Sequence, residues 1–112
     1  MNNTQRYLPV IEACTASAVA CETCANACLK TAAGSDRDIC IALYHDCIDL
    51  CRLAVRLMQR QSALVDEICR LCAITCQAVA QQCNKYADLH CQECAQVCQR
   101  CVEQCEEITA GA

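Results

Sequence analysis

The sequence has few of the residues that build loops, with 2 glycines and 1 proline among 112 residues, and it has no tryptophan or phenylalanine. Small secreted domains stabilised by disulfides are rich in loops, so this shortage argues against that class in spite of 16 cysteines. No stretch approaches the roughly 18 consecutive apolar residues of a membrane-spanning helix. The first residues also lack the basic segment and apolar run of a secretory signal.

Charge and length narrow the remaining classes. The formal net charge of −4 disfavours nucleic acid and anionic membranes as partners. A chain of this length builds one hydrophobic core, so we expect a single domain over residues 1–112. Without a leader the protein is expected to be cytoplasmic, where thiols remain reduced.

The cysteines follow the spacing of an α-helix. The stretch from Cys91 to Cys105 reads CQECAQVCQRCVEQC, with its five cysteines at steps of three, four, three and four residues. At about 100° per residue, these steps confine the thiols to an arc of about 80° on one side of a helix. The residues between them are largely Gln, Glu and Arg, which belong in water. This helix therefore buries sulfur where a core stripe is expected.

The same unit recurs along the chain. The motif C-x2-C-x3-C begins at Cys21, Cys69 and Cys91, and the frame that begins at Tyr44 has tyrosine in place of the first thiol. Each copy lies in a segment of helical apolar periodicity. We therefore predict an all-α fold, an antiparallel up-and-down four-helix bundle with a cysteine-lined core and helices at about residues 8–32, 36–60, 63–84 and 88–109.

Local signals suggest where these helices begin and how they are oriented. Pro9 is expected in the first turn of the first helix, and Ser62 is expected to be the N-cap of the third. Antiparallel packing then places one set of cysteines at one end of the bundle (Cys28, Cys40, Cys83 and Cys91) and another near the opposite end (Cys14, Cys69 and Cys105). The second helix is apolar well beyond its cysteine face, which leaves open whether it is deeply seated or forms a subunit interface.

Three interpretations of the thiols compete. In the first, cysteine serves only as a small hydrophobic residue of the core. This explains one or two buried thiols, but not a total of 16 that are confined to a single stripe on each helix. Disulfides between neighbours on one helix would be strained, because their Cβ atoms lie about 5–6 Å apart and a disulfide needs about 3.8 Å. A helical interaction module stabilised by disulfides between helices remains an alternative.

Metal binding is the third interpretation. Thiolates are soft ligands that select Cu(I), zinc or iron–sulfur clusters. Zinc and iron–sulfur sites use quartets of ligands borne on turns or loops, and no separate quartet is visible in this sequence. Cu(I) accepts two or three sulfurs, and a C-x3-C pair spans about one helical turn. A zinc or general metal-sequestering protein stays open. No pattern of an active site is present, so we expect no enzyme activity.

The arrangement resembles the copper storage proteins, in particular their cytosolic branch. The resemblance covers Cys14 to Cys105 and rests on the C-x2-C-x3-C runs and on the His90–Cys91 step that opens the last helix. It implies homotetramers that store and buffer many Cu(I) ions along the bundle interior, mainly through cysteine pairs. Ser17 and Tyr44 depart from the pattern, because each stands where a further thiol would continue the stripe.

The predicted ligands follow from this interpretation. They are His90, which is expected near one end of the bundle, and every cysteine: Cys14, Cys21, Cys24, Cys28, Cys40, Cys47, Cys51, Cys69, Cys72, Cys76, Cys83, Cys91, Cys94, Cys98, Cys101 and Cys105. His45 points away from the stripe and is expected at the surface or an interface. Met58 lies on the stripe and is expected to fill space. The expected partners are copper ions, further copies of the chain and a copper chaperone.

Overall fold

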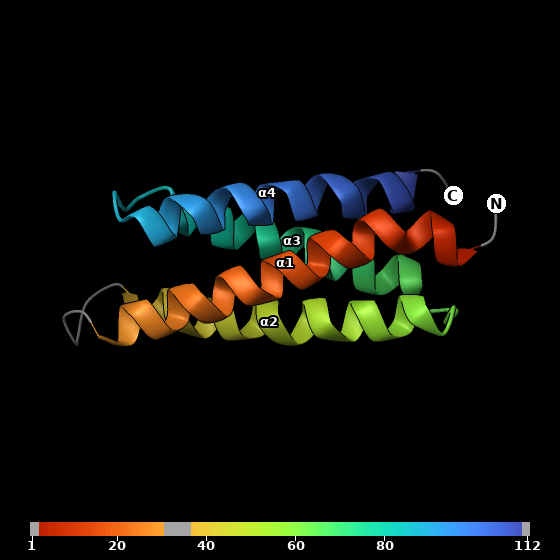
Figure 1. Ribbon diagram of the computed structural model, residues 1–112, viewed down its shortest axis with the longest axis horizontal. Helices are drawn as coiled ribbons and strands as arrows, with labels where there is room; N and C mark the ends of the chain where they lie inside the picture. The colour runs from red at the N-terminus through yellow and green to blue at the C-terminus, as the bar shows by residue number, and fades with distance from the viewer. Residues whose placement is uncertain (1–2, 31–36, 111–112) are drawn as a thin grey trace.

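The protein is a bundle of four antiparallel helices. The computed structural model describes residues 3–30 and 37–110, and these form α1 (Asn3–Leu29), α2 (Arg37–Gln59), α3 (Val65–Cys83) and α4 (Leu89–Ala110). No strand occurs in these two ranges. The helices run side by side along the long axis, and both ends of the chain lie at the same end of the bundle (Figure 1). The predicted all-α fold is confirmed.

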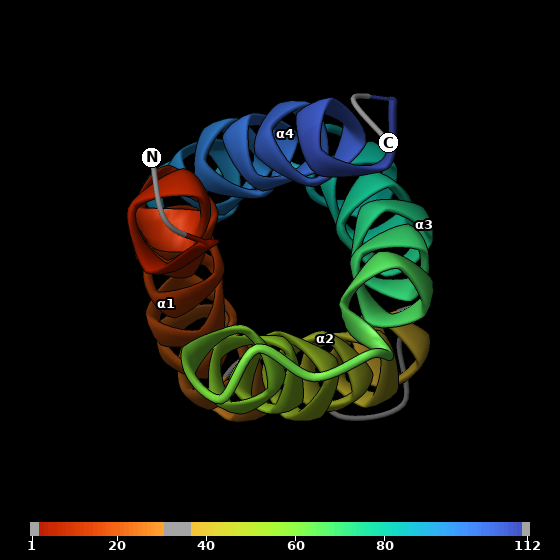
Figure 2. The ribbon, with the colours of Figure 1, turned by 90° about the vertical axis from the view of Figure 1, so that its right-hand side faces the viewer.

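The helices surround one central space. α1 packs against α2 and α4, and α3 packs against the same two helices. Viewed along the axis, the four helices stand at the corners of a square (Figure 2). Because the molecule measures 48 × 19 × 17 Å, the inward face of every helix contributes to a long, narrow core. This geometry turns one stripe on each helix into one wall of a shared interior.

The first helix begins earlier than predicted. α1 starts at Asn3, so Pro9 lies inside the helix and not in its first turn. Tyr7 and Val10 are buried in the core, and this packing stabilises the turns around the proline. The predicted end of the first helix at residue 32 and the predicted beginning of the second at residue 36 lie outside the described residues.

The turn between α2 and α3 also differs from the prediction. The backbone N–H groups of Gln61 and Ser62 donate to the carbonyls of Met58 (3.1 Å) and Leu57 (2.9 Å), with Gln61 at a positive φ of 53°. This is the Schellman pattern that ends a helix. The hydroxyl of Ser62 accepts a hydrogen bond from the N–H of Leu64, and α3 has no side-chain N-cap. The prediction that Ser62 caps the third helix is therefore wrong.

Apolar side chains close the end of the bundle at which the chain termini lie. They come from all four helices and include Tyr7, Val10, Met58, Ile68 and Ile108, all of them buried. At the opposite end α1 ends, α2 begins, and α3 connects to α4. This end contains polar and ionisable groups in place of an apolar plug, so the two ends of the core differ in chemistry.

One segment of α1, Gln5–Leu29, is long and apolar enough to cross a membrane by length and composition alone. A core helix of a soluble protein passes the same test. The sequence prediction counted consecutive apolar residues, and this segment is instead apolar on average. Its cysteine stripe, with Cys14, Cys21 and Cys24, is buried against the other helices of the bundle.

Candidate metal site in the bundle interior

All sixteen cysteines lie inside the bundle. Each is buried, the most exposed being Cys28 at 3%. Every one belongs to the described residues, and all are free thiols. The inward stripe predicted from the spacing is therefore a continuous lining of sulfur, and the disulfide-stabilised module finds no support in this arrangement.

Thiols on the same helix lie close enough to share one ligand. The sulfurs of Cys47 and Cys51 are 3.9 Å apart, and those of Cys94 and Cys98 are 4.0 Å apart. Both are C-x3-C pairs, in which residues i and i+4 stand one above the other on a helix face. One soft metal ion can therefore bridge such a pair without unwinding the helix.

Thiols on different helices approach equally closely. The sulfur of Cys76 in α3 lies 3.5 Å from that of Cys47 and 3.8 Å from that of Cys51 in α2. Between α1 and α4, the sulfur of Cys21 lies 3.8 Å from that of Cys98. Groups of three mutually close sulfurs also occur, such as Cys14 with Cys51 and Cys72. Short contacts thus join sulfurs of all four helices into a network along the axis.

Ser17 replaces a sulfur in the middle of this network. Its hydroxyl is fully buried and lies 3.6 Å from the sulfur of Cys47, 3.5 Å from that of Cys76 and 3.3 Å from that of Cys98. These three thiols come from the other three helices. Ser17 therefore completes a layer of four inward side chains, with a hydroxyl in the position where α1 would supply a fourth thiol.

Tyr44 interrupts the stripe of α2 nearer the polar end. Its ring is fully buried, and its hydroxyl oxygen lies 3.2 Å from the sulfur of Cys83. Burial, with hydrogen bonds to Cys24 and Cys83, raises the pKa of the phenol. The neutral phenol of Tyr44 occupies the position of a thiol, so fewer sulfurs line the core at this level.

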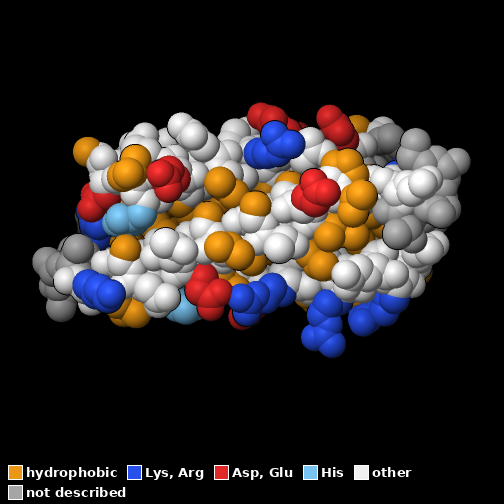
Figure 3. All heavy atoms as spheres, viewed as in Figure 1, with side chains coloured by type: hydrophobic (Ala, Val, Ile, Leu, Met, Phe, Trp, Pro, Cys, Tyr) orange, Lys and Arg blue, Asp and Glu red, His pale blue; other side chains and the backbone are white. Residues whose placement is uncertain are grey.

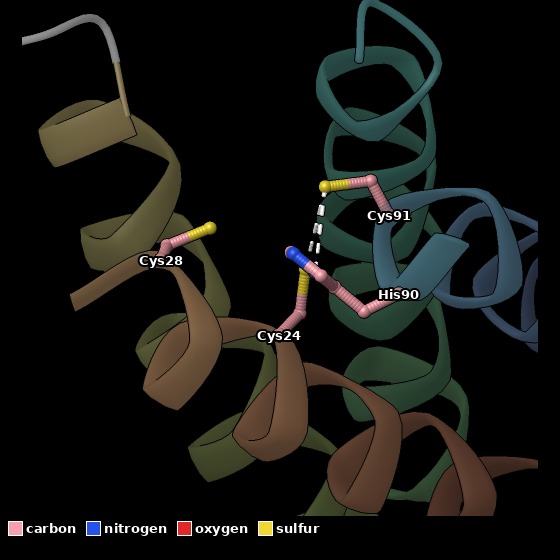
Figure 4. Close-up of side chains that lie close together, drawn as sticks. All are labelled: Cys24, Cys28, His90 and Cys91. Atoms are coloured by element: carbon pink, nitrogen blue, oxygen red, sulfur yellow. Dashed lines mark hydrogen bonds between the residues drawn. The ribbon is translucent and has the colours of Figure 1, made fainter. Parts of the chain in front are cut away.

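Four donor atoms converge at the polar end of the core. They belong to Cys24 and Cys28 of α1 and to His90 and Cys91 of α4, and all lie within 4.8 Å of one another (Figure 4). Nδ1 of His90 is 3.2 Å from the sulfur of Cys24 and 3.5 Å from that of Cys91. The two sulfurs are 3.9 Å apart. We call this group the mouth site.

Two charged residues stand behind the mouth site. The guanidinium of Arg37 lies 2.8 Å from one carboxylate oxygen of Asp88 and 3.9 Å from the sulfur of Cys28. The other carboxylate oxygen of Asp88 is 3.6 Å from Nε2 of His90. The hydrogen bond from Arg37 lowers the pKa of Asp88, so this carboxyl is ionised at neutral pH. Asp88 therefore faces the ring nitrogen of His90 that points away from the sulfurs.

Burial controls the protonation of the thiols at this end. It raises the pKa of Cys28 and of Cys91, and the negative charge of Cys24 raises both further. Deeper in the core, hydrogen bonds outweigh burial at some thiols. The hydrogen bonds of Cys98 with Cys21 and the other surrounding thiols lower the pKa of Cys98. The interior is thus a hydrogen-bonded network in which many thiols keep their protons at neutral pH.

The remaining predicted positions are placed as follows. Cys40 lies near the α3–α4 connection, with its sulfur 4.0 Å from the hydroxyl of Tyr86, at the end expected for it. His45 is exposed, which confirms that it points away from the core. Met58 is fully buried near the apolar end.

Sequence reasoning missed the contributions of Arg37 and Asp88. The only signal for Asp88 is its position two residues before His90. No local pattern pointed to Arg37, which lies 51 residues from Asp88 in the chain.

Comparisons with known proteins agree with this geometry. Residues 3–110 match the family model described as copper storage protein. The uncharacterized cysteine-rich protein YhjQ of Bacillus subtilis (strain 168) is 42% identical over 80 residues, which cover 71% of this chain and 74% of the relative.

Two solved structures have the same fold. Cu(I)-bound copper storage protein BsCsp3 is 39% identical, with a TM-score of 0.88 over 93% of this chain and 98% of that one. A cytosolic copper storage protein from Streptomyces lividans, loaded with five coppers, is 29% identical, with a TM-score of 0.91 over 98% of this chain and 97% of that one.

Proposed function

Because this chain belongs to the copper storage protein family, we propose that its sixteen cysteines and His90 are the ligands with which it stores Cu(I). The function itself is storage and buffering of multiple Cu(I) ions by cysteine thiolates. The observation that carries the assignment of ligands is the connected network of buried, free sulfurs along the whole bundle axis. Cu(I) is a soft ion that thiolates hold in preference to harder cations.

The geometry suggests how the ions are distributed. Pairs such as Cys47–Cys51, at 3.9 Å, hold an ion on one helix, and contacts such as Cys47–Cys76, at 3.5 Å, join neighbouring helices. One thiolate can therefore serve two ions, and the network fills as clusters in place of isolated sites. Ser17 and Tyr44 supply no thiolate, so the network is thinnest at these two levels.

The setting of the protein is a further part of the proposal. We place it in the cytosol, as a single Cu(I)-binding domain over residues 1–112 with no enzyme activity. Two observations support this setting. The fold is like that of a cytosolic copper storage protein from Streptomyces lividans, and free thiols persist only in a reducing compartment. A copper chaperone is the class of partner that would deliver or receive the ions.

Assembly into a homotetramer completes the proposal. Large apolar side chains remain exposed on the isolated chain, among them Val19 (58%), Ile39 (69%) and Ile74 (68%). Hydrophobic side chains are visible over the face that carries α1 (Figure 3). Of the additional apolar residues of α2, Ile39 and Leu53 (42%) remain exposed on this chain, and these two favour a subunit interface.

The proposed ligands predict a strong dependence of Cu(I) affinity on pH. Burial raises the pKa of Cys28 and Cys91, so these thiols are protonated at neutral pH and must lose protons when they bind copper. The apparent affinity is therefore expected to rise with pH, by about tenfold per pH unit for each proton released. Competition with a Cu(I) chelator of known affinity at each pH, under anaerobic conditions, measures this slope. An affinity that stays constant between about pH 6 and pH 8 would exclude protonated thiols as the ligands.

A further inference from the structure

The mouth site, formed by Cys24, Cys28, His90 and Cys91, differs from the rest of the core. We propose that in the copper-free protein it binds one zinc ion in a closed tetrahedral Cys3His site. This inference rests on the proposed ligands of the storage site, because it uses four of them. It adds a second metal, a defined stoichiometry and a role for the residues behind the site.

The number and type of donors at the mouth site match a structural zinc site. Structural zinc sites have four ligands, and Cys3His is one of their common sets. The mouth site offers four donors within 4.8 Å of one another, one of them an imidazole nitrogen. Core groups such as Cys14, Cys101 and Cys105 offer three sulfurs and no nitrogen. The sequence showed no separate quartet because this one combines a C-x3-C pair of α1 with two adjacent residues of α4.

The distances between donor atoms at the mouth site also suit zinc. Zinc binds sulfur at about 2.3 Å and nitrogen at about 2.0–2.1 Å, so a regular tetrahedron has ligand–ligand edges of roughly 3.5–3.8 Å. The edges at the mouth site are 3.9 Å between the sulfurs of Cys24 and Cys91, and 3.2 and 3.5 Å from these sulfurs to Nδ1 of His90. The sulfurs of Cys24 and Cys91 and Nδ1 of His90 therefore lie close to zinc-binding positions, and the sulfur of Cys28 lies within 4.8 Å of these three atoms.

Asp88 and Arg37, behind the ligands, orient His90 for metal binding. A histidine that binds zinc usually presents its other ring nitrogen to a carboxylate, which fixes the tautomer. Asp88 stands 3.6 Å from Nε2 of His90, and Arg37 holds Asp88 at 2.8 Å. The tautomer with its proton on Nε2 leaves the lone pair of Nδ1 facing the sulfurs. Arg37 also lies 3.9 Å from the sulfur of Cys28, where its charge favours the thiolate.

Binding requires no oxidant or reductant. Zinc enters as a divalent ion, each ligand thiol that is still protonated releases its proton to solvent, and His90 binds as the neutral imidazole. Cu(I), a softer ion, takes the same thiolates from zinc during loading. The zinc ion thus occupies the polar end of the core until copper arrives.

Cobalt provides the test, because tetrahedral Co²⁺ bound to thiolates has characteristic visible absorption and binds more weakly than Zn²⁺. Reduced, copper-free protein is titrated anaerobically with Co²⁺, then with Zn²⁺. We expect one equivalent of Co²⁺ to produce the tetrahedral spectrum and one equivalent of Zn²⁺ to abolish it. The inference is overturned if this spectrum does not appear, or if several equivalents of Co²⁺ bind with one affinity.

Variants locate the ion. His90→Ala is expected to remove the tetrahedral spectrum, whereas the matched change His45→Ala at an exposed histidine leaves it intact. Asp88→Ala keeps all four ligands and is expected to weaken Co²⁺ binding by about 10–100-fold. Far-UV circular dichroism confirms that each variant is folded. Equal spectra and affinities for His90→Ala and His45→Ala would refute the assignment.

The outcome separates this inference from the storage function. Each protein is also loaded with Cu(I) and its capacity is measured. Normal Cu(I) capacity without a cobalt site overturns the zinc inference alone. Failure to take up Cu(I) overturns the proposed ligands of the storage site as well.

Discussion

Saturation with Cu(I) is expected to raise the midpoint of thermal unfolding by tens of degrees. Ligands that bind only the folded state stabilise it by mass action, by about 4 kcal/mol for one site at a free concentration 1,000 times its dissociation constant. For a domain of this size each kcal/mol shifts the midpoint by about 4–8 °C, so one such site contributes about 15–30 °C. The native network joins sulfurs of all four helices, and the unfolded chain cannot reproduce it.

Differential scanning calorimetry of copper-free and loaded protein under anaerobic conditions measures this shift. The variant His45→Ala is a suitable control, because His45 is exposed and lies away from the sulfur network. It is expected to show the same rise as the unmodified protein. A midpoint that does not change on loading would contradict interior sites, because ions bound at the surface of a folded bundle do not cross-link its helices.

Replacing the five cysteines of α4 by alanine is expected to remove more than half of the Cu(I) capacity. These residues are 5 of the 16 thiols, but they also serve as partners for thiols of α1. Cys14 contacts Cys101 at 3.7 Å and Cys21 contacts Cys94 at 3.9 Å. Without the thiols of α4, the thiols of α1 lose their closest sulfur partners. The loss of Cu(I) capacity therefore exceeds the share of thiols that is removed.

The matched control replaces five exposed residues of the same helix by alanine: Glu93, Gln96, Gln99, Glu103 and Glu106. It is expected to retain full capacity, because these side chains face solvent. The bound copper is measured by transfer to a strong Cu(I) chelator after removal of excess metal. A loss of about one third in the cysteine variant would indicate that thiols act independently, and the networked account would then be wrong.

The periodic part of this structure was predictable from the sequence. Steps of three and four residues place a side chain on one face of a helix whatever its neighbours are, so the inward position of residues such as Cys94 and Cys98 follows from spacing alone. The short polar breaks then make neighbouring helices antiparallel. The fold and the sulfur lining both follow from these local rules.

The parts that sequence reasoning missed depend on contacts between distant residues. The pair Arg37–Asp88 joins the beginning of α2 to the α3–α4 connection, and no local pattern encodes it. The early start of α1 depends on burial of Tyr7 and Val10 against other helices. Serine is a residue type that is favoured at N-caps, but the backbone N–H of Ser62 is part of the Schellman turn that ends α2. In each case tertiary contacts determine the outcome.

The central claim is that sulfur inside the bundle holds many copper ions at once. An anaerobic titration with Cu(I), in the presence of a chelator that reports free Cu(I), tests it most directly. The account predicts on the order of ten tightly bound ions per chain, because each ion takes two or three of the 16 thiolates and one thiolate can serve two ions. Saturation at one or two ions, or immediate loss of all copper to a weak chelator, would contradict it.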